Sequence, residues 1–330
     1  MVKKIVGYLL LLICVLWGTA ALWFDGPSWR LLAGILAASF ALASLALPIL
    51  LRNKRTGVMS SVALMVAVLV WWFSIPARND RTWLPEVARL PQAIIQDNTL
   101  TVHNVRNFDY RSETEFTERW ETRQFKLDHL RGLDLFLSYW GPRRIAHTIA
   151  SWEFADGGHL AVSIETRKEK GESYSALRGF FRQFEVYYVV ADERDVIGLR
   201  AAHRGEQVFL YHLRHPVEQA RALLLDYMAE INRLTQSPRW YNALTHNCTT
   251  AIRYHAKRAD VAKPWNWRLL ANGYLDELGY ERGTLNTSLP FDELRRRSDI
   301  TVKAKAAIRQ FDFSLRIRQG LPKLAPHGSG

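Results

Sequence analysis

Apolar residues are concentrated at the start of the chain, where three long runs fall within the first 76 positions. The runs are 5–24 (IVGYLLLLICVLWGTAALWF), 31–51 (LLAGILAASFALASLALPILL) and 58–76 (VMSSVALMVAVLVWWFSIP). None of them contains a charged residue, and each approaches the roughly 20 residues that a membrane-spanning helix needs. Tryptophans lie near their ends, where amphipathic rings favour the membrane interface. The pattern predicts a three-helix transmembrane anchor over residues 1–76.

The first run also has the character of a cleavable signal peptide. No A-x-A cleavage site follows it cleanly and two more apolar runs come next, so we expect an anchor. Lys3 and Lys4 precede the first run, and the 52–57 loop carries three basic residues. The positive-inside rule puts both in the cytoplasm, and three spans carry everything after Pro76 to the other side. In a bacterium, this predicts a multi-pass protein of the inner (cytoplasmic) membrane with its C-terminal domain in the periplasm.

Beyond the anchor, the pattern changes to the short alternations that are typical of strands. Residues 77–100 read as a connector, because Pro85 and Pro91 interrupt any long helix. Alternating segments then predict strands at 99–110, 144–154, 159–167, 185–190, 196–200 and 207–213. The turn signal at 155–158 (ADGG) joins two of these strands into an antiparallel hairpin.

Helical spacing returns in the second half of the chain. Pro216 opens a predicted helix over 217–235, and a second helix opens near Asn247, where Asn and Thr can cap it. The end of the chain, 319–330, reads as a disordered tail. We therefore predict an α+β fold, in which three N-terminal transmembrane helices precede a domain with an antiparallel sheet.

The charge of the chain is strongly basic, with 44 Lys and Arg against 32 Asp and Glu. No RGG-type run and no zinc-finger spacing accompany this charge, so we expect no nucleic-acid partner. An anionic membrane surface beside the anchor is one expected partner, and a merely solvated basic face is the alternative. No group of His, Cys and carboxylates shows metal-ligand spacing, and no Gly-rich phosphate loop is present. No metal or cofactor is expected.

Only two cysteines occur, and they differ in setting. Cys14 lies in the first apolar run and Cys248 lies in the exported part, so they cannot pair within one molecule if this topology holds. Cys248 also lies at the predicted start of a helix, whose partial positive charge stabilises a thiolate. These features favour a catalytic thiol. The alternative is a small buried hydrophobic residue, which free Cys often is.

A catalytic thiol needs a base, and ten histidines are available. His246 and His255 lie close to Cys248 in the sequence, but neither has the spacing to face it on a helix. His147 lies on a predicted strand beside the hairpin, and His159 opens the return strand. Either could instead be an ordinary strand histidine that faces solvent.

Five separated segments resemble the Lnb N-terminal periplasmic domain family. They are NVRNFDYRSE (104–113), IAHTIASWEFADGGHLAVSIETRKEKGESYS (145–175), ADERDVIGLR (191–200), YNALTHNCTT (241–250) and SLPFDELRRRSDIT (288–301). The resemblance covers about 101–318, which is the expected periplasmic domain. The family in turn resembles circularly permuted papain-like enzymes, in which a strand-borne His precedes a helix-borne Cys.

This resemblance implies roles for particular residues. Cys248 is the implied nucleophile and His147 the implied general base, while a third group orients the imidazole. Counting residues across the hairpin favours Glu165 for that role, with His159 as the rival. The choice depends on the register, because a shift of one residue turns Glu165 to the other face. Backbone N–H groups at the start of the Cys helix, near Asn247 or Thr249, offer an oxyanion hole.

The implied activity is that of a thioester-forming acyltransferase without a cofactor. A phospholipid donates the acyl chain, and a lipoprotein accepts it. Lnb enzymes join this domain to a membrane portion on its C-terminal side, whereas the spans here are N-terminal, so the substrate stays open. Two alternatives also stay open: a papain-like peptidase or amidase of the cell envelope, and a non-catalytic membrane-tethered binding module.

Overall fold

The chain forms two compact units in the computed structural model, which describes residues 2–245, 248–260 and 262–322. The side chains of Lys3, Lys4 and Cys248 also lie outside the description. The membrane unit comprises residues 1–80, 172–185 and 239–243, and the sheet unit comprises residues 81–171, 186–238 and 244–330. The predicted anchor and the predicted hairpin therefore belong to different units.

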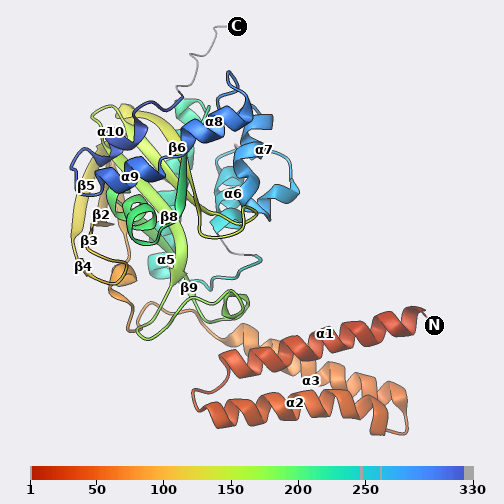
Figure 1. The fold of residues 1–330 in the computed structure, drawn as a ribbon. Helices are drawn as coiled ribbons and strands as arrows, with labels where there is room; N and C mark the ends of the chain where they lie inside the picture. Colours follow the sequence, from red (N-terminus) through yellow and green to blue (C-terminus); the bar gives the residue numbers. More distant parts are fainter. Residues whose placement is uncertain (1, 246–247, 261, 323–330) are drawn as a thin grey trace. The chain divides into compact units, whose positions relative to one another are not determined.

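Three consecutive helices make up most of the membrane unit (Figure 1). They are α1 (Val2–Asp25), α2 (Arg30–Leu50) and α3 (Lys54–Ser74). Each is long and apolar enough to cross a membrane, as the three apolar runs predict. Many of their large apolar side chains are exposed, whereas Ala21, Ala33 and Ala37 are buried. This distribution suits helices that face lipid and approach one another through small residues.

The loop segments of the membrane unit pack against the ends of these helices. The Asp25 carboxylate, at the end of α1, accepts hydrogen bonds from the Trp72 indole at 2.7 Å and from the Arg182 backbone N–H at 3.1 Å. The Arg182 guanidinium lies 4.4 Å from the centre of the Trp72 ring. Helix ends and loop therefore share one polar and aromatic cluster in this unit.

An eight-stranded sheet forms the centre of the sheet unit. Its strands are β1 (Gln92–Gln96), β2 (Thr99–Arg106), β5 (Trp120–Lys126), β6 (Leu130–Tyr139), β7 (His147–Phe154), β8 (His159–Arg167), β9 (Glu185–Ala191) and β10 (Gln207–His212). The order is β1-β2-β9-β8-β7-β6-β10, and β5 also pairs with β2. β2 and β9 pair parallel, whereas β1–β2, β2–β5, β6–β7, β6–β10 and β7–β8 pair antiparallel. Strands β3 (Asp109–Tyr110) and β4 (Phe116–Thr117) form a small separate sheet.

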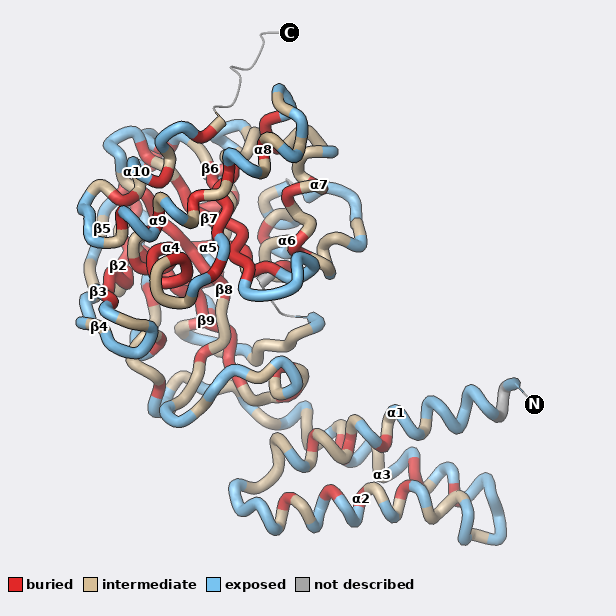
Figure 2. Tube along the Cα trace, in the orientation of Figure 1, coloured by how far each residue is buried: buried red, intermediate tan, exposed pale blue. Residues whose placement is uncertain are grey.

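The predicted hairpin is confirmed as β7 and β8. Ile149 pairs with Ser163 and Glu153 pairs with His159, which sets the register. Gly157 in the connecting turn has φ 81°, a left-handed conformation that favours glycine. Figure 2 shows that burial is concentrated on β6 to β9, so the hairpin lies in the core of the unit.

Helices cover both faces of the sheet. Figure 1 shows α9 (Thr301–Ala307) and α10 (Phe313–Arg318) on one side, with α6 (Cys248–Arg258) and α7 (Leu275–Glu281) on the other. The α4 face is the side of Ile149, which packs in one apolar cluster with Val196 of α4 (Glu193–Gly198) and Ala304 of α9. The α6 face is the side of Trp152, whose indole donates to the carbonyl of Ala220 in α5 (Val217–Gln236). Because side chains alternate along β7, odd-numbered residues from 147 to 153 point to the α4 face.

Seven helices of the sheet unit follow the first strands. They are α4 (Glu193–Gly198), α5 (Val217–Gln236), α6 (Cys248–Arg258), α7 (Leu275–Glu281), α8 (Phe291–Ser298), α9 (Thr301–Ala307) and α10 (Phe313–Arg318). Short turns of 3-10 or π type are η1 (Pro85–Val87), η2 (Leu127–His129), η4 (Leu199–His203), η5 (Trp267–Leu269) and η6 (Asn272–Tyr274), with η3 (Arg178–Phe180) in the membrane unit. The predicted α+β class is confirmed, and α5 and α6 lie where helical spacing predicts them.

Two local predictions fail. The segment 196–200 is helical rather than a strand, because the Asp192 side chain caps α4 by accepting the Arg194 N–H at 2.8 Å. β1 lies within the expected connector, where the backbone of Ala93 exchanges two hydrogen bonds with the Asn232 side chain of α5. A cap outside the alternating run stabilises α4, and a partner distant in the sequence stabilises β1.

Candidate active site

His147 is the first residue of β7, and its imidazole lies on the α4 face in a short polar chain. Its Nε2 is 2.6 Å from the Ser163 hydroxyl and 3.8 Å from Oε1 of Glu165. The Ser163 hydroxyl donates to the Glu165 carboxylate at 2.8 Å. Because that hydroxyl has one proton, its oxygen accepts from Nε2–H, and the Nδ1 of His147 keeps the lone pair.

A buried arginine influences the protonation of the polar groups in this series, His147 and Glu165. Arg200, on η4, donates to Glu165 at 3.0 Å and to Glu206 at 3.1 Å, and Glu206 also accepts from the Ser138 hydroxyl. Burial lowers the pKa of His147 to about 3, and the Arg200 charge adds to that effect against the opposing charge of Glu165. Burial opposes ionisation of Glu165, but Arg200 holds the pKa of that carboxyl well below its usual range. The pair is therefore a neutral imidazole beside a carboxylate.

The helix that begins at Cys248 is joined to the strand that begins at His147. The Asn272 side-chain amide donates to the Thr249 hydroxyl at 2.8 Å and to the Ala146 carbonyl at 2.6 Å. Its oxygen accepts the Ala146 N–H at 2.9 Å. Asn272 is buried on η6, so one amide links the residue after Cys248 to the residue before His147.

α6 is fixed on the sheet by a second buried contact further along the helix. The imidazole of His255 lies between the Tyr188 hydroxyl and the Asp226 carboxylate, at 2.7 Å from each. Its ring stacks on Tyr227 with the two centroids 3.8 Å apart. Burial lowers the pKa of His255 to about 4, although Asp226 opposes the shift. Both ring nitrogens of His255 are therefore engaged in hydrogen bonds that hold α6 in place.

The predicted catalytic residues are thus partly assembled. His147 and Glu165 lie together, whereas the Cys248 side chain and the whole of His246 and Asn247 lie outside the described residues. The His147 ring lies on the α4 face, while Thr249 of α6 meets Ala146 from the α6 face. A contact between His147 and Cys248 therefore requires the imidazole to reach around the end of β7.

The predicted rival, His159, lies far from this site. It pairs with Glu153 at the opposite end of the hairpin, and Glu165 is six positions further along β8, about 20 Å along a strand. Its ring belongs to a group with Asp134 and Glu153, whose possible ligand atoms all lie within 4.8 Å of one another. Glu165 is therefore the group that lies close enough to orient His147, and His159 belongs to a separate group of side chains that could hold a metal ion.

An apolar cavity of about 200 Å³ lies beside the first turns of α6. Leucines line much of it, from the sheet and from the C-terminal helices: Leu135, Leu213, Leu269, Leu275, Leu278 and Leu285. Thr249 and Ile252 contribute from α6, and Arg253, Lys263 and Arg282 add positive charge. The cavity is smaller than the roughly 300–1,000 Å³ of pockets that enclose whole drug-sized ligands. It suits an alkyl segment beside an anionic group.

Sequence reasoning missed Asn272 and this cavity. The residues of the cavity come from β6, α6, α7 and the segments between them, and no local spacing relates them. Asn272 is a single amide in a stretch of short helices and turns, without a motif around it. Its partner Thr249 was noted only for its place beside Cys248.

Comparison with known proteins agrees with the sequence resemblance. Residues 116–273 match the family model of the Lnb N-terminal periplasmic domain, and this range includes His147, Glu165, Cys248 and Asn272. No curated protein and no solved structure matches the chain. The three helices that are able to span a membrane precede the matched range, so this is a membrane-anchored protein with a periplasmic domain. Residues 116–273 therefore constitute an Lnb N-terminal periplasmic domain, as their motifs predict.

Proposed function

We propose that this chain is a cysteine acyltransferase, anchored by several spans in the inner membrane of a bacterium. Its substrates are a phospholipid acyl donor and a lipoprotein amine acceptor. One observation carries the proposal: the Asn272 amide joins the start of α6, at Cys248, to the start of β7, at His147. The apolar cavity beside the same turns of α6 supports an acyl substrate.

The nucleophile in this proposal is the Cys248 thiolate. Cys248 is the first residue of α6, which is 11 residues long. Aligned peptide dipoles give the N-terminus of such a helix a partial positive charge, which favours the thiolate over the thiol. This stabilisation of the thiolate comes from the helix backbone, so it needs no positively charged side chain beside Cys248.

The base in this proposal is Nδ1 of His147. Its Nε2 is held by Ser163, which is itself held by Glu165, so the ring keeps one tautomer. A pKa of about 3 keeps the imidazole neutral at physiological pH. It can then accept the thiol proton when it reaches the thiol around the end of β7, and Glu165 stabilises the imidazolium.

The proposed reaction has two balanced halves. The thiolate attacks the ester carbonyl of the phospholipid, a C–S bond forms, the C–O bond breaks, and the lysophospholipid oxygen takes its proton from His147. A lipoprotein amine then attacks the thioester, a C–N bond forms, the C–S bond breaks, and the amine proton returns to the imidazole. The largely apolar lining of the cavity binds water weakly, which favours transfer over hydrolysis.

One observation favours the alternative of a non-catalytic binding module. The His147 ring makes its described contacts on the α4 face, whereas α6 packs on the other face. In that case Cys248 is a structural residue. The peptidase or amidase alternative uses the same residues, and no described feature favours it over transfer.

Reconstitution in vesicles tests the proposed acyl transfer. Wild-type protein and Cys248→Ser are placed in phosphatidylethanolamine vesicles with isotope-labelled acyl chains and a diacylglyceryl-cysteinyl peptide with a free amine. We expect labelled N-acyl peptide from the wild type and none from Cys248→Ser, while Cys14→Ser, altered in α1, keeps activity. Labelled free fatty acid without N-acyl peptide indicates hydrolysis of the acyl-enzyme in place of transfer, and the absence of both products contradicts the proposed acyl transfer.

A further inference from the structure

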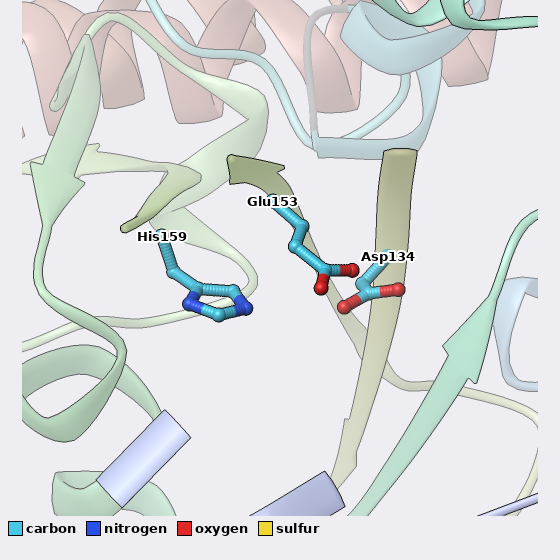
Figure 3. A group of neighbouring side chains, drawn as sticks. All are labelled: Asp134, Glu153 and His159. Carbon is cyan, nitrogen blue, oxygen red and sulfur yellow. The ribbon is translucent and has the colours of Figure 1, made fainter. Parts of the chain in front are cut away.

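A second cluster of ionisable groups lies at the end of the hairpin opposite to His147. It contains Asp134 of β6, Glu153 of β7 and His159 of β8, which are neighbouring strands of the sheet. Figure 3 shows the imidazole and the two carboxylates directed toward one another. Their possible ligand atoms all lie within 4.8 Å of one another. The pairing of β7 with both β6 and β8 holds the three side chains in register.

The state of the His159 ring points to a ligand. His159 is only 6% exposed, and its Nδ1 lies 3.0 Å from the carbonyl oxygen of Gly157. A carbonyl only accepts hydrogen bonds, so Nδ1 carries the proton and Nε2 presents its lone pair to the cluster. Within the described residues, this buried Nε2 has no hydrogen-bond partner. A histidine that binds a metal usually donates its other N–H to a backbone carbonyl or carboxylate in this way.

The charge around the cluster also suits a cation. Asp134 of the cluster lies near a further carboxylate, that of Glu193 in α4. Arg318 is the one guanidinium bonded to both carboxylates, at 2.6 Å and 2.7 Å. Counting Glu153, three carboxylates lie in this region with one guanidinium, and His212 beside Asp134 is the further group that can carry a positive charge.

Asp134 keeps acceptor capacity in spite of its partners. His212 lies with Nδ1 2.5 Å from one Asp134 oxygen, and Arg318 donates to the other. Each carboxylate oxygen has two lone pairs. Arg318 donates to Oδ2 through both Nε and Nη2, so the lone pair that remains for a further ligand is on Oδ1. His212 and Arg318 then orient Asp134 rather than compete for it, as partners outside a metal's ligands commonly do.

We propose that Asp134, Glu153 and His159 bind a divalent transition-metal ion, with Zn²⁺ the best fit. One imidazole nitrogen and two carboxylate oxygens are a ligand set that Zn²⁺ accepts, with a further position for water. Ligand atoms at Zn²⁺ bond lengths lie about 3.4 Å apart, so the three side chains close by about an ångström around the ion. The ion ties β6, β7 and β8 together. This site is independent of Cys248 and of the proposed function.

A binding titration tests the site. Full-length protein in detergent, with any affinity tag removed, is stripped with a chelator, dialysed, and titrated with Zn²⁺ by calorimetry. We expect one tight equivalent for the wild type and for Cys248→Ala, which excludes a site at the thiol. His159→Gln and Glu153→Gln weaken Zn²⁺ binding by at least about tenfold. The matched control His103→Gln, on β2 beside Thr122, retains wild-type affinity.

Two outcomes overturn the proposal. The first is a wild-type protein that binds no Zn²⁺ equivalent, with a melting temperature unchanged by Zn²⁺ after chelator treatment. The second is equal Zn²⁺ affinity in the wild type, His159→Gln and Glu153→Gln. The wild-type melting curve needs no variant, so a variant that fails to fold leaves the test intact. Adding Co²⁺ to the wild type gives a second readout, because a four-coordinate site absorbs strongly in the visible range and a merely hydrated ion does not.

Discussion

At the scale of single residues, burial and then the charge of Arg200 limit the basicity of His147. Arg200 contacts Glu165, and burial together with the Arg200 charge lowers the pKa of His147 to about 3. A base with so low a pKa takes a proton only weakly, so the local field limits its reactivity. Glu165 works in the opposite direction, because its negative charge favours the imidazolium.

Replacing Arg200 is therefore expected to raise the pKa of His147. In Arg200→Gln the nearby positive charge is gone, so the His147 pKa moves up from about 3 toward the ordinary value of about 6.5. Arg200→Lys keeps the charge and serves as the matched control. NMR titration of the His147 ring protons in both variants measures the shift. A His147 pKa that is the same in Arg200→Gln and Arg200→Lys contradicts this electrostatic account.

Asn272 gives a second prediction at this scale. Asn272→Ala removes the amide that serves Ala146 and Thr249, and it leaves their buried polar groups without that partner. We expect a loss of about 1–3 kcal/mol in the free energy of unfolding, measured by urea denaturation. Thr249→Ser keeps the hydroxyl acceptor and should remain close to the wild type. Equal stability of Asn272→Ala and the wild type means that the link is not formed in solution.

At the scale of elements, alternation in the sequence predicts the hairpin and its register well. Ile149, Trp152 and their neighbours on β8 alternate between two buried faces, and the ADGG turn sets the reversal. The same rule fails at 196–200, because two adjacent buried residues, Val196 and Ile197, fit a capped helix as well as a strand. The alternation of apolar and polar residues indicates which positions are buried. It distinguishes a strand from a helix only when the alternating run is long.

The turn of the hairpin gives a prediction for the element as a whole. Gly157 has φ 81°, a conformation in which a side chain is strained even though open space surrounds the site. Gly157→Ala should therefore lower the free energy of unfolding by about 1–2 kcal/mol. Gly132→Ala on β6 also meets open space but lacks a positive φ, so it is the matched control. If both variants unfold at the same urea concentration, the turn does not constrain the hairpin.

The site was less predictable than the hairpin. His147 and Glu165 follow from the register of two neighbouring strands, which a count of residues across the turn supplies. Asn272 and the apolar cavity depend on how α6, η6 and α7 fold back onto the sheet, and all three come more than 90 residues after β7. The His159 cluster likewise joins three strands, so its ligands have no local spacing to detect.

At the scale of the whole molecule, buried neutral histidines make the fold sensitive to acid. His147 and His255 have pKa values of about 3 and about 4 in the folded chain, below about 6.5 in the unfolded chain. The unfolded state therefore binds more protons below pH 6.5, so stability is full above that pH and is lost as pH falls toward 4. The carboxylates with lowered pKa values add their loss only near pH 4 and below.

Unfolding between pH 7 and pH 4.5 covers the range of this contribution. His212, whose pKa Asp134 raises against the effect of burial, contributes in the opposite direction. We expect the urea midpoint of the wild type to fall across that range, and to fall less steeply in His255→Gln. His103→Gln, at a histidine of β2 in a different setting, should follow the wild-type slope. A wild-type midpoint that stays constant or rises as pH decreases contradicts the burial of neutral imidazoles.

The two cysteines lie in different units of the molecule, which gives the central claim a built-in control. Cys14 belongs to α1 in the membrane unit, and Cys248 opens α6 in the sheet unit. In the proposed reaction, the acyl-enzyme intermediate forms on Cys248 and not on Cys14. A stable acyl chain on Cys14 would instead indicate ordinary lipid modification of a membrane helix.

Intact-protein mass spectrometry of the full chain purified from membranes tests this claim most directly. Wild type, Cys14→Ala and Cys248→Ala are compared with and without hydroxylamine, which cleaves thioesters. The account predicts an adduct of fatty-acyl mass on the wild type and on Cys14→Ala, removed by hydroxylamine and absent from Cys248→Ala. An adduct that persists in Cys248→Ala, or no adduct together with a Cys248 that is inert to thiol reagents in the folded protein, would contradict it.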